Sequence, residues 1–387
     1  MKVKIYIKKT LFITMLMISN IVESSGYIPN DDFVLLEVPE TNLVAVYRNK
    51  IDNNPNDVQL LTSLVNELVK QAKKQNSDLL FGQIESMLTK NKRILETNDK
   101  LKILYADVLQ HRHAFDKAKK YLEKIDESNA ALIRATIYQN LGEYSNASRE
   151  CKNIVGRINI FVASTCLIHA RSYQGNLNQS YNALKKISRN IQDPHNKLWS
   201  LTALAEMAYR NGNSDESLEY YQQANQLSPD NKHILSEWVD VLYSEDKQSE
   251  ILELLENNHS DMRLNLRYLR SLFETSKYVD AVHKKDLQDL SNAIMLTELR
   301  EDQRHYDTRA EYYLWIKRDS DNALSWARKN WNVSKTPAAA RLLFMTSKMS
   351  GDISSLKEIK KWMKNSHIED SHLDKLYSSM ESKEMVI

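Results

Sequence analysis

Apolar side chains recur along the middle of the chain at the spacing of a helix rather than a strand. Leu201, Leu204, Ala205 and Ala208 follow one another at steps of three, one and three, which places them on one helical face. The triplet Asn211–Asn213 then interrupts the pattern. Because the glycine at its centre can adopt the left-handed conformation, we expect it to end the helix.

A second helix is predicted directly after this interruption. Ser217, Tyr221 and Ala224 recur at steps of four and three, and Pro229 ends the pattern. The unit is therefore an antiparallel pair of helices, about 34 residues long. The small residues Ala205 and Ser217 fall where the two helices would cross, and Tyr221 is expected to fill the space beside them.

The same unit is repeated along the chain. Gly142 and Gly175 occupy the glycine position in two earlier copies, and His113 stands there in a third. Aligned on this position, the copies begin near residues 99, 128, 161, 198 and 232. A repeat with a period of about 20 to 50 residues is typical of a solenoid, in which each unit packs on its neighbours.

These copies resemble tetratricopeptide repeats, over about Asp99–Asn257 and most clearly in Leu198–Asn231. The resemblance implies an all-α fold in which helix pairs stack into a right-handed α-α superhelix. Within Arg263–Lys364, the stretches RHYDTRAEYYLWIKRDSDNALSWARKNW and KTPAAARLL resemble the C-terminal part of exported bacterial repeat proteins of unassigned function. Some of those proteins are encoded beside small HupE/UreJ-like membrane proteins.

Composition agrees with an all-α chain, because 7 glycines and 6 prolines in 387 residues leave little room for the turns of a β-rich protein. Phe33–Tyr47 differs, being rich in β-branched residues and broken by Pro39. It is either an extended segment that covers the first helix pair or a linker. The predicted organisation is a signal peptide at 1–26, this extended segment or linker at 27–47, a divergent helical repeat at 48–98, tetratricopeptide-like repeats at 99–262, and divergent helical repeats with a polar tail at 263–387.

The N-terminal residues have the pattern of a secretory signal peptide. Four lysines lie within the first nine residues, the apolar run TLFITMLMISNIV follows, and Ser24 and Gly26 supply small side chains before Tyr27. A membrane-spanning helix needs about 20 apolar residues, so cleavage before Tyr27 is favoured over an uncleaved anchor. We therefore expect an exported, periplasmic protein with no transmembrane segment after cleavage.

The charge of the exported chain argues against nucleic acid as a partner. The whole chain carries +2, and residues 1–26 contribute four lysines and one glutamate, which leaves −1 on the mature chain. Binding to a phosphate backbone depends on an excess of basic side chains, and this surface offers none.

The two cysteines lie in neighbouring predicted helices. Cys151 falls on the second helix of one repeat and Cys166 on the first helix of the next. Export to an oxidising compartment favours a disulfide between them, which would stabilise the fold by about 3 kcal/mol in the chain-entropy model. The alternative is a pair of buried thiols that pack as small apolar side chains.

The sequence contains no motif of a known catalytic or cofactor site. It has no His-Glu-x-x-His, no Gly-x-Ser-x-Gly, no phosphate-binding loop and no Cys-x-x-Cys. His111 and His113 are two residues apart, which on a helix points them in different directions and disfavours joint metal ligation. We therefore expect no enzymatic activity, no cofactor and no bound metal.

First-helix side chains that point away from the second helix are predicted to form a polar groove with an aromatic side chain at its end. In three successive units these are Thr136 and Gln139, Thr165 and His169, and Thr202, Glu206 and Tyr209. The alternative is a solvated face without a partner. The groove predicts a scaffold or assembly factor that binds a protein, a peptide or a membrane protein complex. A second hypothesis, suggested by the neighbours of the resembling proteins, is an accessory or substrate-binding subunit of a membrane transport system for a metal.

Overall fold

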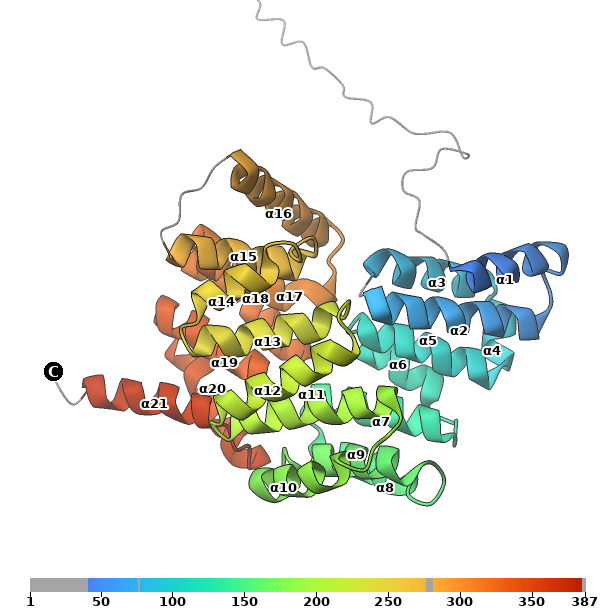
Figure 1. Ribbon diagram of the computed structural model, residues 1–387, viewed down its shortest axis with the longest axis horizontal. Coiled ribbons are helices and arrows are strands. Elements are labelled where there is room, and N and C mark those ends of the chain that lie inside the picture. The colour runs from blue at the N-terminus through green and yellow to red at the C-terminus, as the bar shows by residue number, and fades with distance from the viewer. Residues whose placement is uncertain (1–40, 76, 276–280, 385–387) are drawn as a thin grey trace, which may run out of the picture. The chain divides into compact units, whose positions relative to one another are not determined.

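The computed structural model describes residues 41–75, 77–275 and 281–384, and these residues form helices joined by short turns, with no strand among them (Figure 1). From Leu43 onward, the described residues form one compact unit. In chain order the helices are α1 (Asn42–Asn53), α2 (Val58–Gln75), α3 (Asp78–Lys90), α4 (Lys92–Thr97), α5 (Asp99–His111), α6 (Phe115–Leu122), α7 (Ser128–Asn140), α8 (Tyr144–Asn153), α9 (Ile160–Arg171), α10 (Leu177–Ser188), α11 (Pro194–Arg210), α12 (Ser214–Leu227), α13 (Lys232–Ser244), α14 (Gln248–Leu255), α15 (Met262–Glu274), α16 (Ala281–Leu299), η1 (Gln303–His305), α17 (Tyr306–Glu311), η2 (Tyr312–Lys317), α18 (Ser320–Val333), α19 (Pro337–Ser350), α20 (Ile353–Ser366) and α21 (Ser371–Glu384).

Successive helices pack as antiparallel pairs, which Figure 1 shows from α5 and α6 through α13 and α14. The first helices of these five pairs begin at Asp99, Ser128, Ile160, Pro194 and Lys232, within four residues of the predicted starts. Each first helix also contacts helices of neighbouring pairs, as α5 contacts α7 and α13 contacts α15. The predicted all-α solenoid of stacked helix pairs is therefore confirmed, and the fold is tetratricopeptide-like.

The turns inside the pairs have the backbone conformation that the sequence predicted. Gly142, Gly175 and Gly212 have φ angles of +74°, +70° and +82°. His113, which stands at the same position in an earlier repeat, adopts φ +57°. A left-handed residue here reverses the chain after one helix so that the next packs back against it.

Small side chains let the two helices of a pair approach closely. Ala205 of α11 and Ser217 of α12 are both fully buried, and the Ser217 hydroxyl donates a hydrogen bond to the Ala205 carbonyl oxygen at 2.8 Å. Tyr221 is 4% exposed and packs in the same apolar cluster as Ala205. The predicted roles of these three residues at the helix crossing are confirmed.

The N-terminal part of the described chain corrects one prediction. Residues 42–47 were placed in an extended segment or linker, but they form the first half of α1. Val44 is fully buried there, so packing outweighs the preference of its β-branched side chain for strands. The rest of the predicted extended segment, 27–40, and the predicted signal peptide, 1–26, lie outside the described residues.

A disulfide joins Cys151 of α8 to Cys166 of α9, with their Cα atoms 5.5 Å apart. Both cysteines are buried in the cluster that holds α7, α8 and α9 together. The bond spans 15 residues of sequence. In the part of the chain that the structure describes, no helix has the length and hydrophobicity needed to cross a membrane.

Candidate binding surface

Charged side chains on successive odd-numbered helices form one connected polar surface, which we call the inner polar face. Its members are Glu206 of α11, Glu237 and Asp240 of α13, Arg263 and Arg267 of α15, Asp307 and Glu311 of α17, and Arg341 of α19. These are the first helices of the pairs. Stacked helices of this kind line the concave surface with which solenoids bind their partners.

Arg267 is the centre of the inner polar face and links three helices. Its Nε and Nη2 atoms donate to the two carboxylate oxygens of Asp240, at 2.7 and 2.8 Å, and its Nη1 atom donates to Glu311 at 3.3 Å. The Arg267 side chain is 7% exposed. Such bidentate pairing between a guanidinium and a carboxylate fixes the geometry of the pair as well as its charge. Arg267 therefore holds α13, α15 and α17 in fixed positions relative to one another here.

The carboxylates of the inner polar face differ in the basic groups that lie beside them. Arg263 is the nearest base to Asp307, at 3.9 Å between Nη2 and a carboxylate oxygen. Glu237 lies 3.8 Å from the ring of His233 on its own helix. Burial and the nearby Asp240 charge raise the pKa of Glu237 to about 7. Because 40% of its side chain is exposed, water screens part of that effect.

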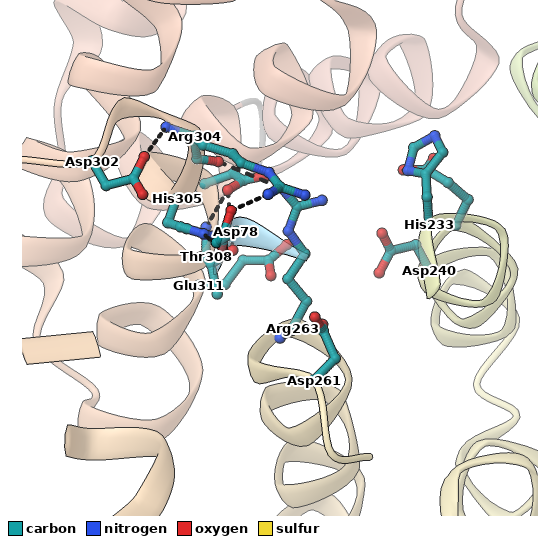
Figure 2. A network of polar contacts seen from close by, with 12 residues as sticks. Asp78, His233, Asp240, Asp261, Arg263, Asp302, Arg304, His305, Thr308 and Glu311 are labelled. Carbon is teal, nitrogen blue, oxygen red and sulfur yellow. Dashed lines mark hydrogen bonds and ion pairs between the residues drawn. The ribbon is translucent and has the colours of Figure 1, made fainter. Parts of the chain in front are cut away.

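Asp78 is the first residue of α3 and connects this helix to η1. Figure 2 shows Asp78 between Arg304 and His305, near Arg263. Arg304 donates to one carboxylate oxygen of Asp78, and His305 Nε2 lies 2.9 Å from the other. Arg304 and His305 are 4% and 5% exposed. Burial opposes the charge on Asp78, but these two partners outweigh it and hold the pKa of that carboxyl well below its usual range.

The same cluster contains three groups at a spacing that could suit a metal ion. Asp78, Asp302 and His305 have ligand atoms within 4.8 Å of one another. The guanidinium of Arg304, however, already contacts Asp78, and a cation in that position competes with a metal for the carboxylate. The arrangement is better explained as an ion pair that joins residues 226 positions apart.

Two of the predicted groove residues meet in a hydrogen-bonded group. His169 of α9 lies 2.8 Å from a carboxylate oxygen of Glu206, while the Tyr173 hydroxyl and Arg210 donate to the other oxygen at 2.5 and 3.3 Å. Burial opposes the charge on Glu206, but His169, Arg210 and Tyr173 together lower its pKa to about 2. Glu206 is therefore a fixed anion at one end of the inner polar face.

Other predicted groove residues do not line an open groove. Thr165 is 1% exposed because it packs into the helix stack, and Tyr209 stacks on His372 with ring centroids 3.8 Å apart. Thr136 is exposed, but its hydroxyl donates to the Leu132 carbonyl oxygen of its own helix. Half-buried Gln139 and Thr202 complete the predicted set, and neither takes part in the group around Glu206. Of the seven predicted residues, the structure thus brings His169 and Glu206 together and buries Thr165.

Most of the inner polar face was not predicted from the sequence, although the sequence carries a signal for it. Charged residues four positions apart share one face of a helix, and three first helices carry such pairs. These pairs are Glu206 and Arg210, Arg263 and Arg267, and Asp307 and Glu311. The last two pairs lie beyond the clearest repeats, where no repeat template shows which side of the helix faces inward.

No family model matches the chain, and no curated protein matches it. Among solved structures, it is similar to a dimer of human IFIT1 with PPP-AAAA (13% identity, TM-score 0.42, 83% of this chain and 89% of that chain). It is also similar to the apo form of the quorum sensor NprR from B. thuringiensis (15%, 0.41, 75% and 95%). A third similar structure is the C-terminal part of a TPR repeat-containing protein from Cytophaga hutchinsonii (15%, 0.32, 62% and 99%). At these TM-scores none of the three bears on the function of the chain.

Proposed function

We propose that this chain is an exported, non-enzymatic solenoid that binds a protein or peptide segment along the inner polar face and serves as a scaffold or assembly factor. The observation that carries the proposal is Glu237, a half-exposed carboxylate near Asp240 and Glu206, with the ring of His233 at 3.8 Å. Burial and the charges of Arg263 and Arg304 lower the pKa of His233 to about 4, so that ring supplies no positive charge at neutral pH. A carboxylate in such surroundings costs folding free energy, and groups of this kind gather at functional surfaces.

The charge of the surface indicates the kind of segment that fits it. Five of its eight members are acids and three are arginines, and Arg341 is already paired with Asp370. A lysine or arginine side chain of a partner would replace the missing cation beside Glu237. Charge complementarity of this kind gives an interface its specificity.

Photo-crosslinking tests the location of the surface. A crosslinking amino acid in place of His233, one turn before Glu237 on α13 and exposed, should capture a partner in the native host, and the same residue in place of Glu219, on the exposed face of α12, should not. Adding Glu237→Lys to the chain with the crosslinker at 233 should abolish the capture because it reverses the charge that attracts the basic segment. Crosslinks from position 219 with none from 233 would contradict the proposal.

Export is a separate part of the proposal and has its own test. It is supported by the lysine-rich start, the short apolar run and the small residues before Tyr27. Intact-mass measurement on protein from the native envelope should show a chain that begins at Tyr27. A chain that retains Met1 and partitions with membranes would show that the segment is an anchor.

The second candidate, an accessory or substrate-binding subunit of a metal transport system, is supported by no contact among the described residues. Metal analysis of protein purified without chelators separates the two candidates. Stoichiometric metal that is lost in Asp302→Asn would favour the transport role, and metal-free protein that retains its partner would favour the scaffold.

A further inference from the structure

Three consecutive repeats contact the C-terminal part of the chain through their turns. A Cβ atom added at Gly142 would lie 3.1 Å from Lys335 Cβ, one at Gly175 3.3 Å from His367 Cβ, and one at Gly212 2.9 Å from Ser371 Oγ. We call this line of contacts the closing seam. It brings together residues that are far apart in the sequence, so it closes one turn of the solenoid on itself.

Hydrogen bonds cross the closing seam at each of the three turns. The Lys335 backbone N–H donates to the Asn140 carbonyl oxygen at 2.6 Å, and the Tyr144 hydroxyl donates to the Lys335 carbonyl oxygen at 2.9 Å. The Leu177 N–H donates to Glu369 at 2.7 Å, across 192 positions of sequence. His372 Nε2 lies 3.0 Å from the carbonyl oxygen of Tyr209.

The contacts across the seam are mainly polar, whereas those within each repeat are apolar. The apolar cluster that crosses the seam consists of Tyr144, Tyr173 and Ile368, with Trp362 packed against it. Neighbouring repeats are held by larger clusters of alanine, leucine and isoleucine. Elements held by few buried apolar contacts separate at a lower free energy than the global unfolding. We therefore expect the seam to open at a lower free energy than the unfolding of a repeat.

The seam adjoins the inner polar face. Arg341 pairs with Asp370 and lies over the Tyr209 ring at 5.0 Å. The charges of Glu237 and Glu206 also act on the same guanidinium. Asp370 of the seam is therefore in direct contact with a member of the inner polar face.

We propose that Lys335 and the segment from His367 to Leu373 form a latch that closes the solenoid on the turns at Gly142, Gly175 and Gly212, and that its release opens the inner polar face to a partner. The part of this proposal that concerns a partner rests on the proposed function. The opening itself does not, because it is measured on the protein alone.

Glycines away from the seam provide a matched control for the test. Gly156 and Gly351 have φ angles of +79° and +75°, like the seam glycines, but a Cβ atom added at either would meet nothing within 4 Å. The double variant Gly142→Ala/Gly175→Ala and the control Gly156→Ala/Gly351→Ala therefore share the cost of a left-handed alanine. Only the first places methyl groups in the seam.

Hydrogen–deuterium exchange with peptide-level mass spectrometry reads the seam directly, through the Lys335 and Leu177 amides that donate across it. We expect about tenfold faster exchange of both in the seam variant, as for the loss of one or two hydrogen bonds. The amides of α12, away from the seam, should be unchanged. The control variant should exchange at the wild-type rate at both positions.

A third variant keeps the result interpretable if the alanine substitutions impair folding. His372→Ala leaves every turn intact and removes the contact with Tyr209, so it should speed exchange at Leu177 and Lys335 without changing α12. Equal exchange in seam and control variants, or seam amides that exchange only with global unfolding, would overturn the latch. If the amides respond but crosslinking at position 233 does not increase, the latch stands and its link to the partner fails.

Discussion

The aromatic ring of Tyr209 stacks on the imidazole of His372, 163 positions later in the chain, with ring centroids 3.8 Å apart. Arg341 adds a guanidinium over the same tyrosine at 5.0 Å. Tyr209 is thus packed between its own helix and the C-terminal segment, where the sequence predicted the open end of a groove. A substitution of Tyr209 is therefore expected to change the stability of the fold. A loss of binding in such a variant would not by itself show that Tyr209 contacts a partner.

Tyr209→Ala should lower the free energy of unfolding by about 2 kcal/mol, because it removes a half-buried ring and its stacking contact with His372. In a double-mutant cycle with His372→Ala, the coupling should be about 1 kcal/mol. Urea unfolding measures both values. Glu219→Lys, on an exposed position of α12, should stay within about 0.5 kcal/mol of wild type. Additive effects of the two substitutions would show that the stack contributes nothing.

Glu206→Gln should destabilise the fold by about 2 kcal/mol at pH 7, because it leaves His169 and Arg210 without their anion. The pKa of Glu206 is lowered in the fold to about 2, so its contribution is present above its ordinary pKa and is lost as the pH falls toward 2. The gap between variant and wild type, measured by urea unfolding, should therefore narrow from pH 6 to pH 3. A constant gap would contradict this account.

Glu237→Gln should stabilise the fold at pH values above the pKa of Glu237, since that pKa is raised in the fold to about 7. A carboxyl with a raised pKa favours the fold while protonated, and this contribution is lost as the pH rises through the folded pKa. The variant should therefore melt at a higher temperature than wild type at pH 8 and at the same temperature at pH 5. Glu219→Gln serves as the control, with no difference between the two pH values. A lower melting temperature for Glu237→Gln at pH 8 would show that Glu237 has a cationic partner.

The disulfide between Cys151 and Cys166 should be found intact in protein isolated without reductant. Peptide mapping without reduction should recover one linked pair, and two freely alkylated thiols would contradict the bond. Cys151→Ala/Cys166→Ala should cost about 3 kcal/mol, as the chain-entropy model gives for a loop of 15 residues. Reduction of the wild type should cause a loss of similar size.

Predictions that rest on a single turn or a single helix pair agree with the structure. Gly142, Gly175 and Gly212 adopt the left-handed conformation because the choice depends on the residue and its immediate neighbours. Ala205 and Ser217 meet at a crossing because the helix period alone brings them to the same face. The same reasoning placed His169 and Glu206 on adjacent first helices of the clearest repeats, and the structure brings them within 2.8 Å of each other.

The sequence by itself determined the helices, the turns between them and the pairing of neighbours, because these follow from interactions within about 40 residues of chain. Only the tertiary structure decided the contacts of Asp78 with Arg304 and of Tyr209 with His372, which are separated by 226 and 163 positions. Such contacts depend on how a small rotation between successive repeats adds up along the solenoid. That sum includes the divergent repeats after residue 262, where no local pattern fixes the rotation. The inner polar face and the closing seam are both products of this accumulated geometry.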